Sequence, residues 1–219
     1  IDHAEAKNMR TVDLTRALHG RMPLYPGTRP PVLSDEHTLE SDKFRETRLE
    51  FSSHTGTHID APAHLLPTAR TLDQLPPETF LGRACVIDCR GRSIIGADLI
   101  ERERGRGAEF LLFLTGWEDK WGQAAYFEGY PVFDDSCVDS ILSLRLKGVG
   151  IDTMSIDPVG FVRQPNHIRI LGAGMIIIEN MCNLAHIGEE CALCALPLLY
   201  PAADGAPCRA VAVINQPKI

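Results

Sequence analysis

Residues 53–64 limit the possible structures of this chain more strongly than any other segment. They read SHTGTHIDAPAH and hold three of the eight histidines together with a carboxylate. Histidines four positions apart could share one face of a helix. However, Gly56 and its flanking threonines are poor helix formers, and Pro62 would end a helix there. An extended chain explains the spacing better, because alternate side chains of a strand share one face.

In an extended chain, His54, His58 and Asp60 point the same way, and Gly56 leaves an open slot between the two imidazoles. Two neutral imidazoles and a carboxylate that converge are a good ligand set for a divalent transition metal. A polar, solvated strand face is the alternative interpretation. Residues 46–53 also alternate between apolar and polar side chains. We therefore predict one strand over residues 46–60 that delivers the metal ligands.

The string HTGTHIDAPAH resembles the signature of the cyclase-type metal-dependent hydrolases, a family that includes bacterial kynurenine formamidase and isatin hydrolase. Shorter motifs of the same family match in order along most of the chain. They lie at residues 12–15, 25–27, 115–117, 150–153, 178–180 and 207–210. The central motif is long and specific, whereas each shorter motif alone would be weak.

The resemblance implies a site with two metals per chain, zinc or alternatively manganese. One metal would be held by His54, His58, Asp60 and Glu179. The second would be held by His167, with Asp60 and Glu179 as bridging ligands. Two metals close together can share a hydroxide and polarise a carbonyl group.

Two of these residues can also be judged without the resemblance. Glu179 ends the apolar run of residues 175–178, and a carboxylate is costly to bury there without a partner. This favours a cation near Glu179. For His167, an ordinary loop histidine after Asn166 is an equally good interpretation of the sequence alone.

His64 and Tyr25 take their expected roles from the resemblance. His64 matches the general acid/base of the family, although by itself it could equally be a surface histidine. Tyr25 lies where formamidases place an aromatic side chain against the substrate ring. A simple turn residue before Pro26 is the alternative for Tyr25.

The implied reaction is hydrolysis of a carboxamide-type C–N bond in a small molecule, with metal-activated water and His64 as the proton carrier. The substrate would be an aryl formamide such as N-formylkynurenine, or a cyclic amide. An isatin-like lactam or an ester is the alternative within the family. Thr57 stands where kynurenine formamidases often have alanine. A non-catalytic metal- or ligand-binding domain is a further alternative, although none of the matched ligands is missing.

Composition excludes several other classes of protein. A net charge of −7 argues against nucleic-acid binding, which needs a basic face. No apolar run approaches the roughly 20 residues of a membrane span, and residues 1–8 lack the apolar core of a signal peptide. The seven cysteines have no framework spacing, which indicates reduced thiols. We expect a cytoplasmic homodimer or homotetramer whose other partner is a small-molecule substrate.

The remaining pattern predicts one domain over residues 1–219, of the α/β class with a mixed sheet. A helix is expected from Asp134 or Asp135 to a closing Gly148, and a loop around Asp157 and Pro165. Residues 1–9 are expected to be disordered or loosely packed. The resembled family has a compact swivelling β/β/α fold, which we expect here. Strands are predicted at 83–90 and 149–152, and buried strands at 110–115, 174–179, 193–199 and 209–214.

Overall fold

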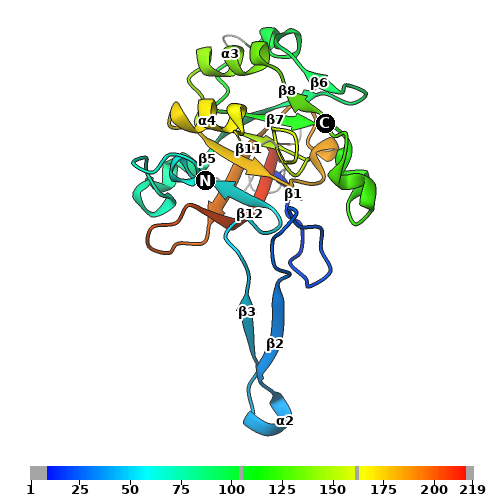
Figure 1. Cartoon of the computed structure of the whole chain (residues 1–219), viewed down its shortest axis with the longest axis vertical. Coiled ribbons are helices and arrows are strands. Elements are labelled where there is room, and N and C mark those ends of the chain that lie inside the picture. Colours follow the sequence, from blue (N-terminus) through cyan, green and yellow to red (C-terminus); the bar gives the residue numbers. More distant parts are fainter. Residues whose placement is uncertain (1–8, 104–105, 161–162, 216–219) are drawn as a thin grey trace.

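A mixed eight-stranded sheet organises the protein in the computed structural model, which describes residues 9–103, 106–160 and 163–215 (Figure 1). Neighbouring strands β5, β7, β9 and β10 run parallel, and the other pairs are antiparallel. The α/β mixed sheet is therefore confirmed. In spatial order the strands are β1 (Met9–Asp13), β12 (Gly205–Asn215), β11 (Glu190–Pro197), β5 (Leu81–Asp88), β7 (Phe110–Leu114), β9 (Gly148–Ile151), β10 (Ile176–Glu179) and β4 (His58–Asp60).

Strand β4 closes this sheet on itself. It pairs with β10 along one edge and with the start of β12 along the other. A strand of only three residues therefore has no free edge, and its backbone is held from both sides. The side chains carried by β4 are correspondingly well fixed in space.

The sheet separates two apolar cores, which explains why its central strands are continuously apolar. In β7, Leu112 packs into the core enclosed by the sheet, whereas Leu111 packs against the helices. The helices are α3 (Asp135–Ser143) and α4 (Pro165–Gly172), which contact each other and lie on the same side of the sheet (Figure 1). Both faces of the central strands are thus buried.

Helix α3 begins as predicted but ends earlier. The Asp134 side chain caps it by accepting a 2.8 Å hydrogen bond from the backbone N–H of Cys137. The prediction that Gly148 closes this helix is wrong, because Gly148 is the first residue of β9. A Cβ atom at Gly148 would lie 2.5 Å from the carbonyl oxygen of Ile176, so close strand packing is what requires the glycine.

Helix α4 replaces part of the predicted loop. Pro165 occupies its first turn, where a proline costs no hydrogen bond. Gln164 precedes it with a φ of 36°, in the left-handed region that few non-glycine residues adopt. His167 is therefore a buried helical residue and not a loop histidine.

The predicted strand over residues 46–60 is two separate strands. Strand β3 (Glu46–Glu50) pairs with β2 (Val32–His37) in a hairpin that extends away from the rest of the protein (Figure 1). The short helix α2 (Leu39–Asp42) lies at its tip. Every residue of β3 is exposed, so the alternation there marks a hairpin and not a half-buried sheet strand.

The remaining elements are short. Strands β6 (Ile94–Ile95) and β8 (Val132–Phe133) form a separate parallel pair. Residue 9 belongs to β1, and the prediction for residues 1–8 lies outside the described residues. In the described ranges, no helix combines the length and the apolar character needed to cross a membrane. The 3₁₀ turns are Pro62–His64, Leu72–Gln74, Pro77–Phe80, Ala97–Leu99, Glu101–Glu103, Trp117–Lys120, Ala124–Phe127 and Leu184–His186.

Candidate metal centre

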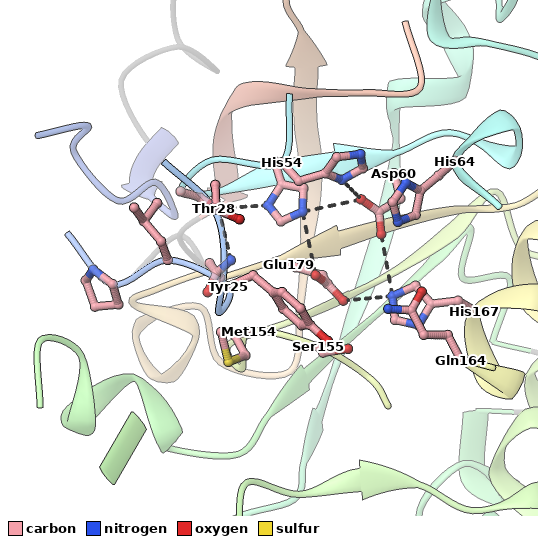
Figure 2. A pocket seen from close by; sticks show the side chains of 15 residues that line it. Tyr25, Thr28, His54, Asp60, His64, Met154, Ser155, Gln164, His167 and Glu179 are labelled. Atoms are coloured by element: carbon pink, nitrogen blue, oxygen red, sulfur yellow. Dashed lines mark hydrogen bonds and ion pairs between the residues drawn. The ribbon is translucent and has the colours of Figure 1, made fainter. Parts of the chain in front are cut away.

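One pocket of about 240 Å³ is lined by every residue that the sequence predicted for the site (Figure 2). Its floor combines residues from β4, β10 and α4 with residues from the loops before and after β4. The predicted residues that line it are Tyr25, His54, His58, Asp60, His64, His167 and Glu179.

Strand pairing positions the ligands on β4. His58 lies opposite Glu179 on β10, and Asp60 lies opposite Gly205 on β12. Ile59 points into the enclosed core, so His58 and Asp60 point the other way, into the pocket. Alternation along an extended chain therefore holds for these two residues.

His54 lines the pocket, but it does not lie on the same strand as His58 and Asp60 as predicted. It lies outside β4, and the chain turns at Gly56, which has a φ of 67°. The predicted open slot beside Gly56 is wrong, since a Cβ atom there would lie 2.8 Å from Cδ2 of Leu18. The glycine is needed for the turn that brings His54 back beside Asp60.

Asp60 is the centre of the cluster. Its Oδ1 atom lies 2.6 Å from His54 Nδ1 and 3.3 Å from His58 Nε2. Its Oδ2 atom lies 3.6 Å from His167 Nε2. Glu179 makes a second bridge, with Oε1 at 3.0 Å from His167 Nε2 and Oε2 at 3.6 Å from His58 Nε2.

The chemistry of this donor set fits a metal. Asp60 and Glu179 are 1% and 5% exposed, and their ion pairs within the described chain go only to imidazoles. Burial and the charge of Asp60 raise the pKa of Glu179. Ligand atoms of His58, Asp60 and Glu179 lie within 4.8 Å of one another. Two buried carboxylates this close need positive charge between them, and imidazoles with carboxylates suit a divalent transition metal.

The carboxylates in turn favour the protonated forms of two of the imidazoles. Burial disfavours protonation of His54 and His167, but the neighbouring carboxylates outweigh it and raise the pKa of each to about 10. His64 behaves oppositely. Burial and the positive charges of His54 and His167 oppose its protonation and lower its pKa to about 4, although Asp60 and Asp204 act the other way. This environment favours the neutral form of the His64 imidazole.

Two carboxylates of the site were missed by sequence reasoning. Asp157 is buried, and its Oδ2 atom accepts hydrogen bonds from the His167 backbone N–H at 3.0 Å and from His167 Nδ1 at 2.7 Å. Asp204 Oδ2 lies 2.9 Å from His54 Nε2 and 3.9 Å from His64 Nδ1. The hydrogen bond with His54 lowers the pKa of Asp204 to about 2 against the opposing effect of burial. The Asp-Pro pair at residues 157–158 and the Asp-Gly pair at residues 204–205 could be recognised as turn sequences. No pattern in the neighbouring sequence connected either pair to the site.

The wall of the pocket is formed mainly by uncharged side chains. Tyr25 lines it, and its hydroxyl accepts a 3.2 Å hydrogen bond from the backbone N–H of Gly160. Met154 and Gln164 line it as well (Figure 2). Among the described lining residues, none is lysine or arginine. The cavity therefore suits a small, largely uncharged molecule above a polar floor.

Comparison with known proteins agrees with this geometry. The family model described as "Putative cyclase" matches residues 12–158. Kynurenine formamidase from Geobacillus thermodenitrificans is 30% identical over 202 residues, which cover 91% of this chain and 95% of that protein. Kynurenine formamidase from Bacillus cytotoxicus is 31% identical over 205 residues, with the same coverage of 91% and 95%.

A solved structure supports the fold. Isatin hydrolase A from Ralstonia solanacearum superposes with a TM-score of 0.85 at 24% identity, covering 95% of this chain and 93% of the other. The sheet and its helices thus belong to a known fold. Its sequence, matched over most of its length, and its fold show that this chain belongs to the cyclase family of metal-dependent hydrolases.

Proposed function

We propose that this protein hydrolyses the amide C–N bond of a small aryl amide, either a formamide or a cyclic amide. The observation that carries the proposal is the position of His64 beside a buried cluster of imidazoles and carboxylates at the floor of one pocket. The relatives named kynurenine formamidase support an open-chain formamide. The fold shared with isatin hydrolase A supports a cyclic amide as the second candidate substrate.

The proposed cofactor is a pair of zinc ions, with manganese as the alternative. His54, His58, Asp60 and Glu179 would hold the first ion. His167 would hold the second, with Asp60 and Glu179 shared between the two, as their positions between His58 and His167 support. When bound, such metals lower the pKa of water and polarise a carbonyl oxygen.

His64 is the proposed proton carrier. It ends the 3₁₀ turn Pro62–His64, and its ring centre lies 4.0 Å from that of His54. It is half-buried and lines the pocket, so it is accessible from the substrate side. In its neutral form it accepts a proton from the attacking water and then donates it to the leaving nitrogen.

Tyr25 is the proposed binding residue for the aromatic ring of the substrate. Its own ring lines the pocket, and its hydroxyl is anchored to the backbone at Gly160. An anchored aromatic side chain presents a flat apolar surface at low entropic cost. The uncharged wall supports an aryl amide without a charged substituent as the better substrate.

The first experiment combines metal analysis with hydrolysis assays. Purified protein is stripped with a chelator, reloaded with zinc or manganese, and tested on a formanilide and on an isatin-type cyclic amide. We expect hydrolysis of at least one substrate to disappear with the metal and to return on reloading. A metal-loaded protein that hydrolyses neither class would favour a non-catalytic binding domain instead.

The number of metals is tested with Glu179→Gln. This variant keeps the side-chain shape but removes one of the two negative charges that offset the repulsion between the ions. We expect the ion near His167 to be lost first, as measured by metal stoichiometry per chain. Full activity of the wild-type protein with one zinc ion, under saturating zinc, would contradict the two-metal model.

We further propose that the protein is a cytoplasmic homodimer or homotetramer. Exposed apolar residues on the β2–β3 hairpin, such as Val32, Leu33 and Leu49, support self-association. All seven cysteines are unpaired, which supports a reducing compartment. Light scattering coupled to size-exclusion chromatography tests the oligomeric state, and a monomer at micromolar concentration would contradict it.

A further inference from the structure

The three histidines of the cluster do not face it with the same nitrogen atom. His58 and His167 turn Nε2 towards the bridging carboxylates. Their Nδ1 atoms face away, one to the carbonyl oxygen of Gly56 at 2.8 Å and the other to Asp157 at 2.7 Å. His54 is reversed, because its Nδ1 atom lies 2.6 Å from Asp60 and its Nε2 atom lies 2.9 Å from Asp204.

A neutral imidazole has one N–H group and one lone pair. The nitrogen that binds a metal must present the lone pair, so the N–H group must lie on the other nitrogen. The hydrogen-bond acceptor on that other side therefore decides which nitrogen is the ligand. For His54 that acceptor is the carboxylate of Asp204.

Asp204 is fixed in place by backbone contacts. Its carbonyl oxygen accepts a 2.9 Å hydrogen bond from the N–H of Ala61, which directly follows Asp60. The next residue, Gly205, pairs with Asp60 across β12 and β4. These contacts fix the backbone from which the Asp204 carboxylate reaches His54.

Gly205 provides the space for the reversed ring. A Cβ atom at this position would lie 2.5 Å from His54 Cε1 and 2.8 Å from His54 Nε2. Any other residue would push the ring off the backbone. This close approach is independent of the hydrogen bond between His54 and Asp204. Both observations place the Nε2 edge of the His54 ring against residues 204 and 205.

We propose that Asp204 and Gly205 form a positioning pair that makes His54 an Nδ1 metal ligand, whereas His58 and His167 bind through Nε2. The inference rests on the proposed metal site and adds the residue and the atom that orient one of its ligands. Asp204 acts through His54, and its 3.9 Å approach to His64 Nδ1 places the same carboxylate beside the proposed proton carrier.

The tautomers can be read directly by nuclear magnetic resonance. In zinc-loaded protein with ¹⁵N-labelled histidine, long-range ¹H–¹⁵N correlations distinguish an Nε2–H ring from an Nδ1–H ring. We expect one zinc-bound histidine with its proton on Nε2, whose signals are absent in His54→Ala. His54 with its proton on Nδ1 would overturn the proposal, even if the protein binds zinc and hydrolyses amides.

Zinc affinity gives a second, independent measurement. In competition with a chromophoric chelator, Asp204→Ala should weaken zinc binding by about 10–100-fold, the usual effect of removing such an acceptor. Asp204→Asn should recover most of this loss, because its amide oxygen can still accept from Nε2–H. The matched control Asp35→Ala removes an exposed carboxylate on the hairpin, and thermal melts verify folding.

The outcomes separate this inference from the proposed function. Wild-type zinc affinity in folded Asp204→Ala overturns the positioning pair and leaves the proposed hydrolase intact. Failure of the wild-type protein to bind zinc or manganese overturns both. A loss of affinity in Asp204→Ala with recovery in Asp204→Asn supports the pair whether or not the correct substrate has been found.

Discussion

The two halves of the metal centre are built from different kinds of structure. In one half, His167 and Glu179 come from α4 and β10, and the Asp157 side chain behind His167 is only 1% exposed. In the other half, His54 and His64 lie outside the sheet, and the Asp204 side chain behind His54 is 46% exposed. Asp60 is the residue that belongs to both.

This difference suggests separate roles: the buried half holds ligand side chains in place, and the open half takes part in the reaction. The buried half has little freedom, because a helix and a strand fix its side chains and a buried carboxylate orients the imidazole. The open half borders the pocket, where water and substrate must enter, and it contains His64. We therefore expect changes in the buried half to cost stability, and changes in the open half to cost turnover.

The largest effect is expected from a change at Asp60, the residue shared by the two halves of the metal centre. Asp60→Asn keeps the side-chain shape but removes the negative charge shared by His54, His58 and His167. We expect loss of metal from both positions and loss of hydrolysis, measured by elemental analysis and by the amide assay. Asp35→Asn on the hairpin is the control. Retention of one full equivalent of metal in Asp60→Asn would show that the halves bind independently.

The next largest effect is expected from His64→Ala, in the open half. The metal content should stay at the wild-type level, while kcat falls by about 10²–10⁴, the usual contribution of a positioned acid/base. Steady-state kinetics and metal analysis on the same sample test both parts. Loss of metal would move His64 into the ligand set, and near-normal turnover would remove it from proton transfer.

A matched pair of variants compares the two outer carboxylates directly. Asp157→Asn disturbs a buried acceptor of three N–H groups, from the backbone of Asn166 and His167 and from the His167 ring. The free energy of unfolding should fall by about 1–3 kcal/mol. Asp204→Asn should lower it by less, because about half of the Asp204 side chain is exposed and solvent screens its pair with His54. Urea unfolding of both variants in metal-free form measures the two changes. Equal losses in the free energy of unfolding would contradict the expected difference.

The smallest effect is expected at the pocket wall. Tyr25→Phe keeps the ring but removes the hydroxyl that accepts from the N–H of Gly160. The hydrogen bond orients the ring before substrate binds, so its loss should raise KM by at most about fivefold, the equivalent of about 1 kcal/mol, with kcat unchanged. Tyr25→Ala should raise KM further. A Tyr25→Ala variant with wild-type KM would show that the ring does not contact the substrate.

Sequence reasoning captured the parts of the site that are local in the chain. His58 and Asp60 follow strand alternation, so their shared direction could be predicted from spacing alone. Glu179 was supported by the cost of burying a carboxylate, whereas the position of His167 came only from a family resemblance. Asp157 and Asp204 reach their histidines through the pairing of distant strands and the start of α4, which no local pattern encodes.

Two errors have clear physical causes. Alternation over residues 46–53 was extended to Asp60, but the pattern of an exposed hairpin strand is the same as that of a half-buried one. The segment that forms helix α4 was expected to belong to a loop around Asp157 and Pro165. At the first turn of a helix a proline is favourable, and the apolar residues that follow pack on α3 and the sheet.

The double pairing of β4 has a consequence for how the protein is made. His58 and Asp60 leave the ribosome early, but their strand partners β10 and β12 are translated much later. A nascent chain must therefore keep β4 unpaired through most of its synthesis, with its metal-binding side chains unorganised. Such distant contacts form slowly. Metal should consequently be captured after translation, in a final step in which β12 docks against β4 and places Asp204 behind His54.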